Sequence, residues 1–213
     1  ALPISGTIIA VDTPFTYDFK EPKYVSRAGF KLEKALEHFK IDVTGCVVMD
    51  AGLSTGGFTD CLLQKGAKKV YGVDVGYGQV HEKIRNDPRV EVIERTNLRE
   101  VRDLGQLVDL VTLDLSFISV LKVMDAVDAV LKPDGKLLVL IKPQFEAGRE
   151  KVGKKGVVRE ISTHKEVVHG IIDFLLEQDL NVLGVGYSPI KGPEGNREYL
   201  VYFSKNKDKE SSF

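Results

Sequence analysis

The chain has 213 residues, of which 43% are hydrophobic, and its formal net charge at pH 7 is −1. This length suits a single α/β domain with short extensions. The near-neutral charge excludes a general electrostatic attraction to nucleic acid, so any surface that binds it must be a local basic patch.

The sequence has no pattern typical of a membrane span, a secretory signal or a metal site. Its longest aliphatic run, Leu137–Ile141, is far shorter than the roughly 20 residues that cross a bilayer. Cys46 and Cys61 lie within apolar segments, and none of the four histidines has ligand spacing to them. We therefore expect buried, unpaired cysteines, no bound metal and a reducing compartment, either the cytoplasm or an organelle.

The two ends of the chain are predicted to lie outside the folded domain, which we expect to span residues 25–204. Residues 1–24 contain a strand-like stretch at 7–11 followed by turns, and we interpret them as a connector. The polar segment 205–213 is expected to be a disordered tail.

Within the domain, the first predicted element is a helix. Apolar residues recur at helical spacing from Ser26 to Phe39, and Ser26 is the expected N-cap. Further along the chain, Lys132–Gly135 is a strong turn signal that ends a later helix. Thr163 and Glu166 have the spacing of a capping box, which predicts that the last helix begins at Thr163.

Between these signals, apolar strands and helices alternate. The expected strands are 47–50, 69–74, 90–94, 108–114, 136–142, 180–187 and 197–203, and the expected helices among them are 56–64, 80–86, 120–131 and 163–179. Continuous apolar strands separated by helices are typical of a parallel sheet covered on both faces. The last two strands have no helix between them and are expected to form a hairpin. The sequence therefore predicts an α/β, Rossmann-like fold with a mostly parallel, seven-stranded sheet whose last strand is antiparallel.

A glycine-rich loop after the first strand is the clearest functional motif. Glycines let the backbone approach a ligand closely, and the following helix offers unpaired N–H groups. The residues of this segment that we expect to contact a cofactor are Asp50, Gly52, Ser54, Thr55, Gly56, Gly57 and Phe58.

The second and third strands add further cofactor contacts. Asp74 and Val75 follow the second strand about 20 residues after the loop, where a carboxylate can accept hydrogen bonds from both hydroxyls of a ribose. Asn97 and Leu98 follow the third strand and are expected near the adenine, although Asn97 is also typical of a helix cap.

Two cofactors would suit this arrangement, a dinucleotide and S-adenosyl-L-methionine. The loop reads G-x-S-x-G-G rather than G-x-G-x-x-G, and the acidic strand end suits an α-amino group better than a pyrophosphate. These features favour the methyl donor over a nicotinamide, and a glycine turn without any ligand is the remaining alternative.

Six segments together carry a resemblance to a known family; they are 24–32, 50–58, 73–79, 113–117, 141–146 and 195–199. They resemble the TlyA (haemolysin A) family of ribosomal RNA 2′-O-methyltransferases, within the broader FtsJ/RrmJ-like class. The resemblance implies a class I methyltransferase fold, S-adenosyl-L-methionine as the cofactor, and ribosomal RNA or a ribosomal subunit as the partner. Family members carry an S4-type RNA-binding domain before the methyltransferase, and residues 7–13 are similar only to the connector after it.

The same resemblance places the catalytic tetrad of the family on Lys31, Asp114, Lys142 and Glu198. Asp114 and Lys142 end the fourth and fifth predicted strands, where open α/β sheets form their ligand crevice. Lys142 corresponds to the proposed general base of the family. Lys31 and burial would lower its pKa, whereas the two carboxylates would raise it. Two buried ion pairs with a structural role are the alternative, and Lys142 could also reach solvent.

A basic segment is predicted beside the cleft. Residues 146–160 contain five basic and three acidic side chains together with three glycines, so we expect a mobile loop that contacts phosphates. The side chains expected to contact RNA are Lys23, Arg27, Arg149, Lys151, Lys154, Lys155 and Arg159. A solvated loop without any RNA contact is the alternative.

The leading hypothesis is a ribose methyltransferase that acts on ribosomal RNA. A membrane-active haemolysin and a non-catalytic RNA- or ribosome-binding module are the alternatives from other classes, and a nicotinamide-dependent enzyme is a remote fourth. Liposome leakage would favour the haemolysin, whereas the intact tetrad argues against a binding module without catalysis.

Overall fold

The computed structural model describes residues 22–205. The predicted strand-like stretch at 7–11, most of the connector and all of the tail after Lys205 lie outside the described residues, so those expectations stay predictions.

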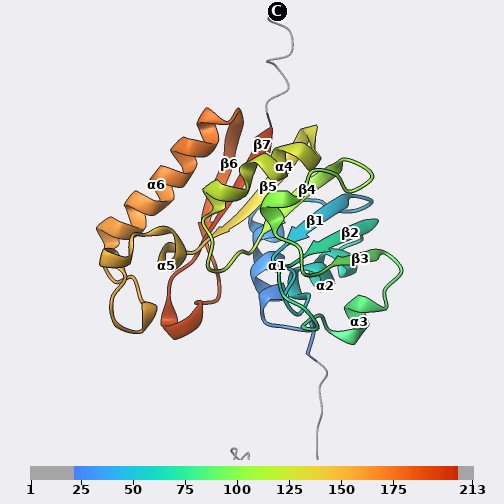
Figure 1. Ribbon diagram of the computed structural model, residues 1–213, viewed down its shortest axis with the longest axis horizontal. Helices are drawn as coiled ribbons and strands as arrows, with labels where there is room; N and C mark the ends of the chain where they lie inside the picture. The colour runs from blue at the N-terminus through green and yellow to red at the C-terminus, as the bar shows by residue number, and fades with distance from the viewer. Residues whose placement is uncertain (1–21, 206–213) are drawn as a thin grey trace, which may run out of the picture.

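A seven-stranded mixed sheet forms the centre of the domain, with the order β3-β2-β1-β4-β5-β7-β6 (Figure 1). Its strands are β1 (Val47–Ala51), β2 (Lys69–Val73), β3 (Val90–Ile93), β4 (Val108–Leu113), β5 (Leu131–Ile141), β6 (Leu180–Tyr187) and β7 (Tyr199–Lys205). The strands β1 to β5 pair in parallel, and β7 runs antiparallel to both β5 and β6. The predicted fold class is thereby confirmed, including the closing hairpin.

Helices cover both faces of this sheet. They are α1 (Ala28–Phe39), α2 (Gly57–Gln64), α3 (Glu82–Arg85), α4 (Met124–Val130), α5 (Pro143–Glu146) and α6 (Ile161–Glu177). Successive strand residues face opposite sides, so Val48 packs with α1 and α2, whereas Met49 packs with α4 and α6. Burial on both faces explains why the strands read as continuous apolar runs rather than as alternating ones.

Two predicted helix starts are wrong. The N-cap of α1 is Arg27 without a side-chain cap hydrogen bond, because Ser26 packs instead against the start of α2. The helix α6 begins at Ile161 with Glu160 as its N-cap, so Thr163 lies buried inside the first turn. Glu166 forms an ion pair with Lys151 (2.5 Å). Tertiary packing thus overrides the local capping signals.

The turn signal at Lys132–Gly135 appears as a bulge inside a strand rather than as the start of a loop. The strand β5 already begins at Leu131, which pairs with Val108, and pairing resumes between Lys136 and Leu110. The residues between the two pairs are extruded, so the turn prediction is correct locally, although the strand begins earlier than expected.

Candidate active site

The glycine loop leaves β1 and passes directly beneath the end of β4. Gly52 has φ +89°, and a Cβ there would lie 2.4 Å from the carbonyl oxygen of Asp114. Gly56 also has a positive φ, and a Cβ on Gly57 would lie 2.2 Å from Ser26 Oγ. The close contacts of the loop with β4 and with the start of α1 therefore require glycine at these positions.

Asp50 lies underneath this loop rather than at its surface. Its side chain is 0% exposed and accepts hydrogen bonds from Thr59 Oγ1 (2.7 Å) and Thr112 Oγ1 (3.1 Å). Burial raises the pKa of this carboxyl to about 6, although the two hydroxyls oppose the shift. Asp50 thus ties β1 to α2 and β4, and it does not line the cavities described below.

Asp74 at the end of β2 organises the surface of the loop. Its Oδ2 accepts a hydrogen bond from Ser54 N–H and its Oδ1 accepts one from Gly76 N–H, both at 2.7 Å. The first bond holds Ser54 in its left-handed conformation, with φ +49°. Each carboxylate oxygen has a second lone pair, so Asp74 can accept hydrogen bonds from a ligand in the cavity that it lines.

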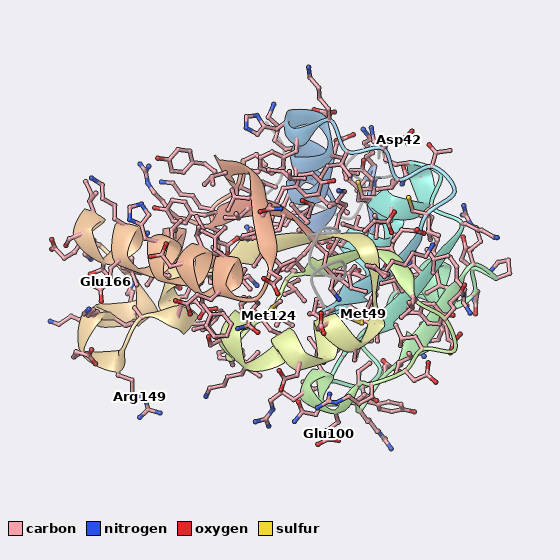
Figure 2. The ribbon with its side chains drawn as sticks, turned by 90° about the horizontal axis from the view of Figure 1, so that it is seen from above. Asp42, Met49, Glu100, Met124, Arg149 and Glu166 are labelled. Atoms are coloured by element: carbon pink, nitrogen blue, oxygen red, sulfur yellow. The ribbon has the colours of Figure 1, made fainter. Side chains whose placement is uncertain are left out.

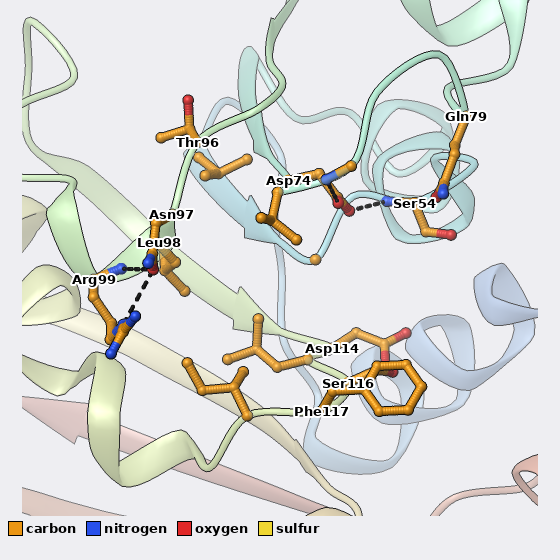
Figure 3. A pocket seen from close by; sticks show the side chains of 16 residues that line it. Ser54, Asp74, Gln79, Thr96, Asn97, Leu98, Arg99, Asp114, Ser116 and Phe117 are labelled. Atoms are coloured by element: carbon orange, nitrogen blue, oxygen red, sulfur yellow. Dashed lines mark hydrogen bonds between the residues drawn. The ribbon is translucent and has the colours of Figure 1, made fainter.

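A cavity of about 530 Å³ opens above the carboxyl ends of β1, β2 and β4 (Figure 3). The predicted cofactor residues that line it are Gly52, Ser54, Asp74, Val75, Asn97, Leu98 and Asp114. A smaller cavity of about 130 Å³ adjoins it and shares Gly52, Ser54, Asp114 and Ser116. The predicted residues that line only this smaller cavity are Thr55, Gly57, Phe58 and Lys142. Gly56, like Asp50, supports the loop from outside both cavities.

Asn97 combines the two roles considered for it. It caps a short 3-10 turn (Leu98–Glu100), and its Oδ1 accepts a hydrogen bond from Arg99 N–H at 3.1 Å. It also lies in the wall of the larger cavity (Figure 3).

The larger cavity fits S-adenosyl-L-methionine in size and chemistry. Its volume falls in the range of small-molecule sites, roughly 300–1,000 Å³. A glycine loop forms its floor, and Asp74 lies where a ribose would be bound. Leu98, Leu115 and Ile118 supply apolar surface for a base. No observation within residues 22–205 opposes this cofactor.

The tetrad forms two ion pairs. Lys142 Nζ lies 2.6 Å from Asp114 Oδ1 and donates a hydrogen bond to Ser116 Oγ at 3.1 Å. Lys31 Nζ, from α1, lies 2.5 Å from Glu198 Oε2. Both lysines are nearly buried, with 6% of Lys31 and 8% of Lys142 exposed.

The strand register relates these two ion pairs to each other. Ile141 of β5 pairs with Tyr199 of β7, so Lys142 and Glu198 are the next opposite residues in this antiparallel pair. Opposite residues point to the same face of a sheet, here the face covered by α1. Of the two ion pairs, the Lys142–Asp114 pair lines the smaller cavity, whereas Lys31 and Glu198 line neither of the two cavities described above.

Sequence reasoning missed the aromatic residue at the rim. Phe117 follows β4 and lines the larger cavity, with φ +65°, 89% of its surface exposed, and its ring centroid 4.8 Å from that of Phe145. A bulky residue with positive φ is an outlier that the surrounding structure must hold. The available signal was an aromatic residue in the loop that follows the carboxyl end of β4.

All of the predicted RNA-contacting residues are exposed at the surface. Arg27 lies at the start of α1, and Lys23 forms an ion pair with Glu33. Arg149 lies at the outer end of the basic loop, far from the sheet (Figure 2). Two 3-10 turns, Arg149–Lys151 and Lys154–Gly156, give this loop partial regular structure.

No helix within 22–205 is long and apolar enough to cross a bilayer. The same residues contain no group of three or more His, Cys, Asp or Glu side chains that could hold a metal ion.

The fold and the cavity define a class I, S-adenosyl-L-methionine-dependent methyltransferase. The sequence profile of the FtsJ-like methyltransferases matches residues 24–205. The chain belongs to this family, and the predicted fold, enzyme class and cofactor are confirmed.

Two relatives and one solved structure show which members of the family this chain resembles. The protein YqxC of Bacillus subtilis is 44% identical over 92% of this chain and 71% of its own length. The Mycobacterium tuberculosis protein named 16S/23S rRNA (cytidine-2′-O)-methyltransferase TlyA is 44% identical over 89% of this chain and 71% of its length. A solved structure of a hemolysin-like protein from Streptococcus thermophilus has a TM-score of 0.84 and 42% identity, covering 89% of this chain and 70% of that one. The resemblance to TlyA is thereby confirmed.

Proposed function

We propose that this protein transfers a methyl group from S-adenosyl-L-methionine to a ribose 2′-hydroxyl of ribosomal RNA. The observation that carries the proposal is the Lys142–Asp114 ion pair at 2.6 Å in the wall of the smaller cavity, directly beside the cofactor cavity. The activity in the name of the TlyA relative supports this choice of substrate and points to a cytidine. Such a reaction takes place where ribosomes are, in the cytoplasm or in an organelle.

The cofactor-binding residues have separate roles in this proposal. When bound, S-adenosyl-L-methionine supplies the methyl group from its sulfonium. Asp74 accepts hydrogen bonds from the ribose of the cofactor, and Asn97 and Leu98 contact the base. Asp50 acts indirectly because it is buried beneath the loop that it holds.

Lys142 and Asp114 act on the acceptor. The hydroxyl oxygen must lie in line with the carbon–sulfur bond that breaks, and its proton must leave as the carbon–oxygen bond forms. Asp114 holds Lys142 Nζ, and Ser116 Oγ fixes it from a second side. Lys142 thereby positions the hydroxyl and, in its neutral form, accepts the proton. The Lys31–Glu198 pair positions the adjoining ends of α1 and β7.

The rim offers a surface for the target base. RNA methylated at a single position is generally recognised with the base unstacked and placed on an aromatic ring. Phe117 is exposed beside both Asp114 and Ser116, as Figure 3 shows. We assign the basic side chains Arg27, Arg149, Lys154, Lys155 and Arg159 to nearby phosphates.

Mapping of ribose methylation on bacterial ribosomal RNA tests the function. The RNA is incubated with the protein and isotopically labelled cofactor, and its fragments are analysed by mass spectrometry. We expect label at a single 2′-oxygen or a few of them. Label on a base, or bound cofactor without any label transfer to ribosomal subunits or RNA, would contradict the proposal. Liposome leakage by the same preparation would instead support the membrane-active alternative.

A further inference from the structure

A second groove lies on the other face of β7 from Glu198. Its deeper part has a volume of about 430 Å³ and is lined by Val158, Arg159, Ile161, His164, Tyr187, Gly195, Arg197 and Tyr199. A neighbouring hollow of about 350 Å³ shares Ile161, His164, Tyr187 and Tyr199 and continues between α6 and β6. We call the two together the α6–β7 groove. The side chains of Arg197 and Tyr199 alternate with that of Glu198, so the groove and the tetrad use opposite faces of one strand.

Asn196 brings the parts of the groove together. This residue is buried, its Oδ1 accepts a hydrogen bond from Val158 N–H at 3.1 Å, and its Nδ2 donates to the carbonyl oxygen of Gly156 at 2.9 Å. The end of the basic loop is therefore fixed to the connection between β6 and β7. As a result, Arg159 and Arg197, far apart in the sequence, lie on one cavity.

The groove combines free positive charge with aromatic surface. Arg159 and Arg197 are exposed, and neither forms an ion pair with another residue in 22–205. Tyr187 is 68% exposed, and its ring centroid lies 5.4 Å from that of Tyr199. An exposed aromatic ring beside unpaired guanidinium groups is the combination with which proteins bind single-stranded nucleic acid, because the ring stacks on a base and the charges contact phosphates.

His164 adds an unused hydrogen-bond acceptor at the base of the groove. The side chain is only 7% exposed, and its Nε2 donates to the carbonyl oxygen of Val158 at 3.0 Å. The proton on Nε2 leaves Nδ1 as an acceptor, and Nδ1 has no hydrogen-bond partner within the described chain. A buried polar atom without a partner on a cavity wall is typical of a site that a ligand completes.

We propose that the α6–β7 groove binds a single-stranded nucleotide of the RNA substrate outside the methylated position. Its base stacks on Tyr187, its phosphates contact Arg159 and Arg197, and a donor of the nucleotide bonds to His164. The inference rests on the proposed function and extends it. The groove is lined by Tyr187 at the carboxyl end of β6 and by Tyr199 at the start of β7. These strand ends lie at the same edge of the sheet as the carboxyl end of β5, which Lys142 follows (Figure 1). One RNA strand can therefore contact both.

Binding of a fluorescein-labelled oligouridylate, measured by anisotropy, tests the stacking contact. Loss of one base–aromatic stack weakens binding roughly fivefold to a hundredfold, so Tyr187→Ala should lose that much and Tyr187→Phe should retain most of the affinity. Leu183→Ala is the control, because Leu183 is 51% exposed on the same strand but lines neither part of the groove. Equal affinities for Tyr187→Ala and the parent, or no binding by the parent, would overturn the proposal.

Salt titration tests the phosphate contacts. Each phosphate contact to a single strand contributes about 0.7 to the slope of log affinity against log salt concentration. Arg159→Gln and Arg197→Gln should each lower the slope by about that amount, a change that a purely structural role would not cause. Lys68→Gln is the control, since Lys68 is exposed before β2 at the opposite edge of the sheet. Unchanged slopes in both arginine variants would contradict the assignment.

The two proposals can fail separately. If the protein binds the oligonucleotide through Tyr187 but never labels ribosomal RNA, the groove stands and the methylation target is wrong. If ribosomal RNA is labelled while Tyr187→Ala binds the oligonucleotide normally, the function stands and the groove is not an RNA site. A change of oligomeric state in Tyr187→Ala, measured by sedimentation, would identify the groove as a protein interface and overturn the proposal.

Discussion

The two halves of the sheet form their parts of the active site in different ways. The half from β1 to β3 holds the cofactor cavity with backbone geometry, namely glycines with positive φ and N–H groups that bond to Asp74. The half from β5 to β7 contributes the charged side chains of Lys142 and Glu198, which form ion pairs with Asp114 and Lys31 from other parts of the sequence. Cofactor binding in the first half should therefore be sensitive to changes in backbone conformation. Activity in the second half should instead depend on which side chains carry a charge.

We expect the largest loss of activity from a substitution in the half of the sheet from β5 to β7. Lys142→Ala removes the group that positions the hydroxyl and accepts its proton, so kcat should fall by about a hundredfold to ten-thousandfold. Cofactor affinity, measured by calorimetry, should stay unchanged because Lys142 lines only the smaller cavity. A variant with normal turnover would exclude Lys142 from the reaction.

A second ion pair on the same two strands provides the matched control for Lys142. Lys132 Nζ lies 2.6 Å from Asp109 Oδ1, the same separation as in the Lys142–Asp114 pair, but it lies near the start of the two strands. Lys132→Ala should therefore leave kcat unchanged. A comparable loss in both variants would show that ion pairing on β4 and β5 supports activity only by stabilising the sheet.

In the first half, we expect the largest effect from Gly52→Ala. The added Cβ would lie 2.4 Å from the carbonyl oxygen of Asp114, which forces the loop away from β4. Cofactor affinity should fall by roughly a hundredfold, in line with about 3 kcal/mol of local strain. Gly45→Ala separates the strain of a positive φ from the contact with Asp114. Gly45 has φ +73°, but a Cβ there would meet no atom within 4 Å. Equal cofactor affinities in the two variants would show that the contact with Asp114 is unimportant.

Asp50, which lies beneath the glycine loop, should make the stability of the folded protein depend on pH. The pKa of Asp50 is raised from 3.8 to about 6, so the folded state binds its proton more tightly than the unfolded state does. The contribution of Asp50 to the unfolding free energy is therefore highest below pH 4, and about 3 kcal/mol is lost as the pH rises to about 6. Asp50→Asn lacks this titration. The difference between the denaturation curves of parent and variant should change in that window and be flat above it; parallel dependence on pH would contradict the burial-driven shift.

The sequence could predict features that depend on local pattern, but not those that depend on tertiary contacts. The glycine loop, the position of Asp74 after the second strand and the mostly parallel sheet with its antiparallel last strand follow from local pattern and spacing, and the structure has them where expected. The start of α6 was wrong because burial of Thr163 is a tertiary effect. The contact role predicted for Asp50 overlooked Thr59 and Thr112, whose hydroxyls enclose the carboxyl. The α6–β7 groove had no sequence signal, since Arg159 and Arg197 reach one cavity through tertiary hydrogen bonds such as that between Asn196 and Val158.

The smallest expected effect tests whether Asp74 binds a ligand or only shapes the loop. Asp74→Ala should weaken cofactor binding roughly tenfold, the value of about one charged hydrogen bond, with kcat at saturation unchanged. Asp103 supplies the control, because its Oδ1 also accepts a hydrogen bond from the N–H two residues later, Gly105, at 2.7 Å, but it lines neither cavity. Asp103→Ala should not change cofactor affinity. If Asp74→Ala lowered kcat as strongly as it lowered affinity, the carboxylate would be fixing the loop for the reaction rather than holding the ribose.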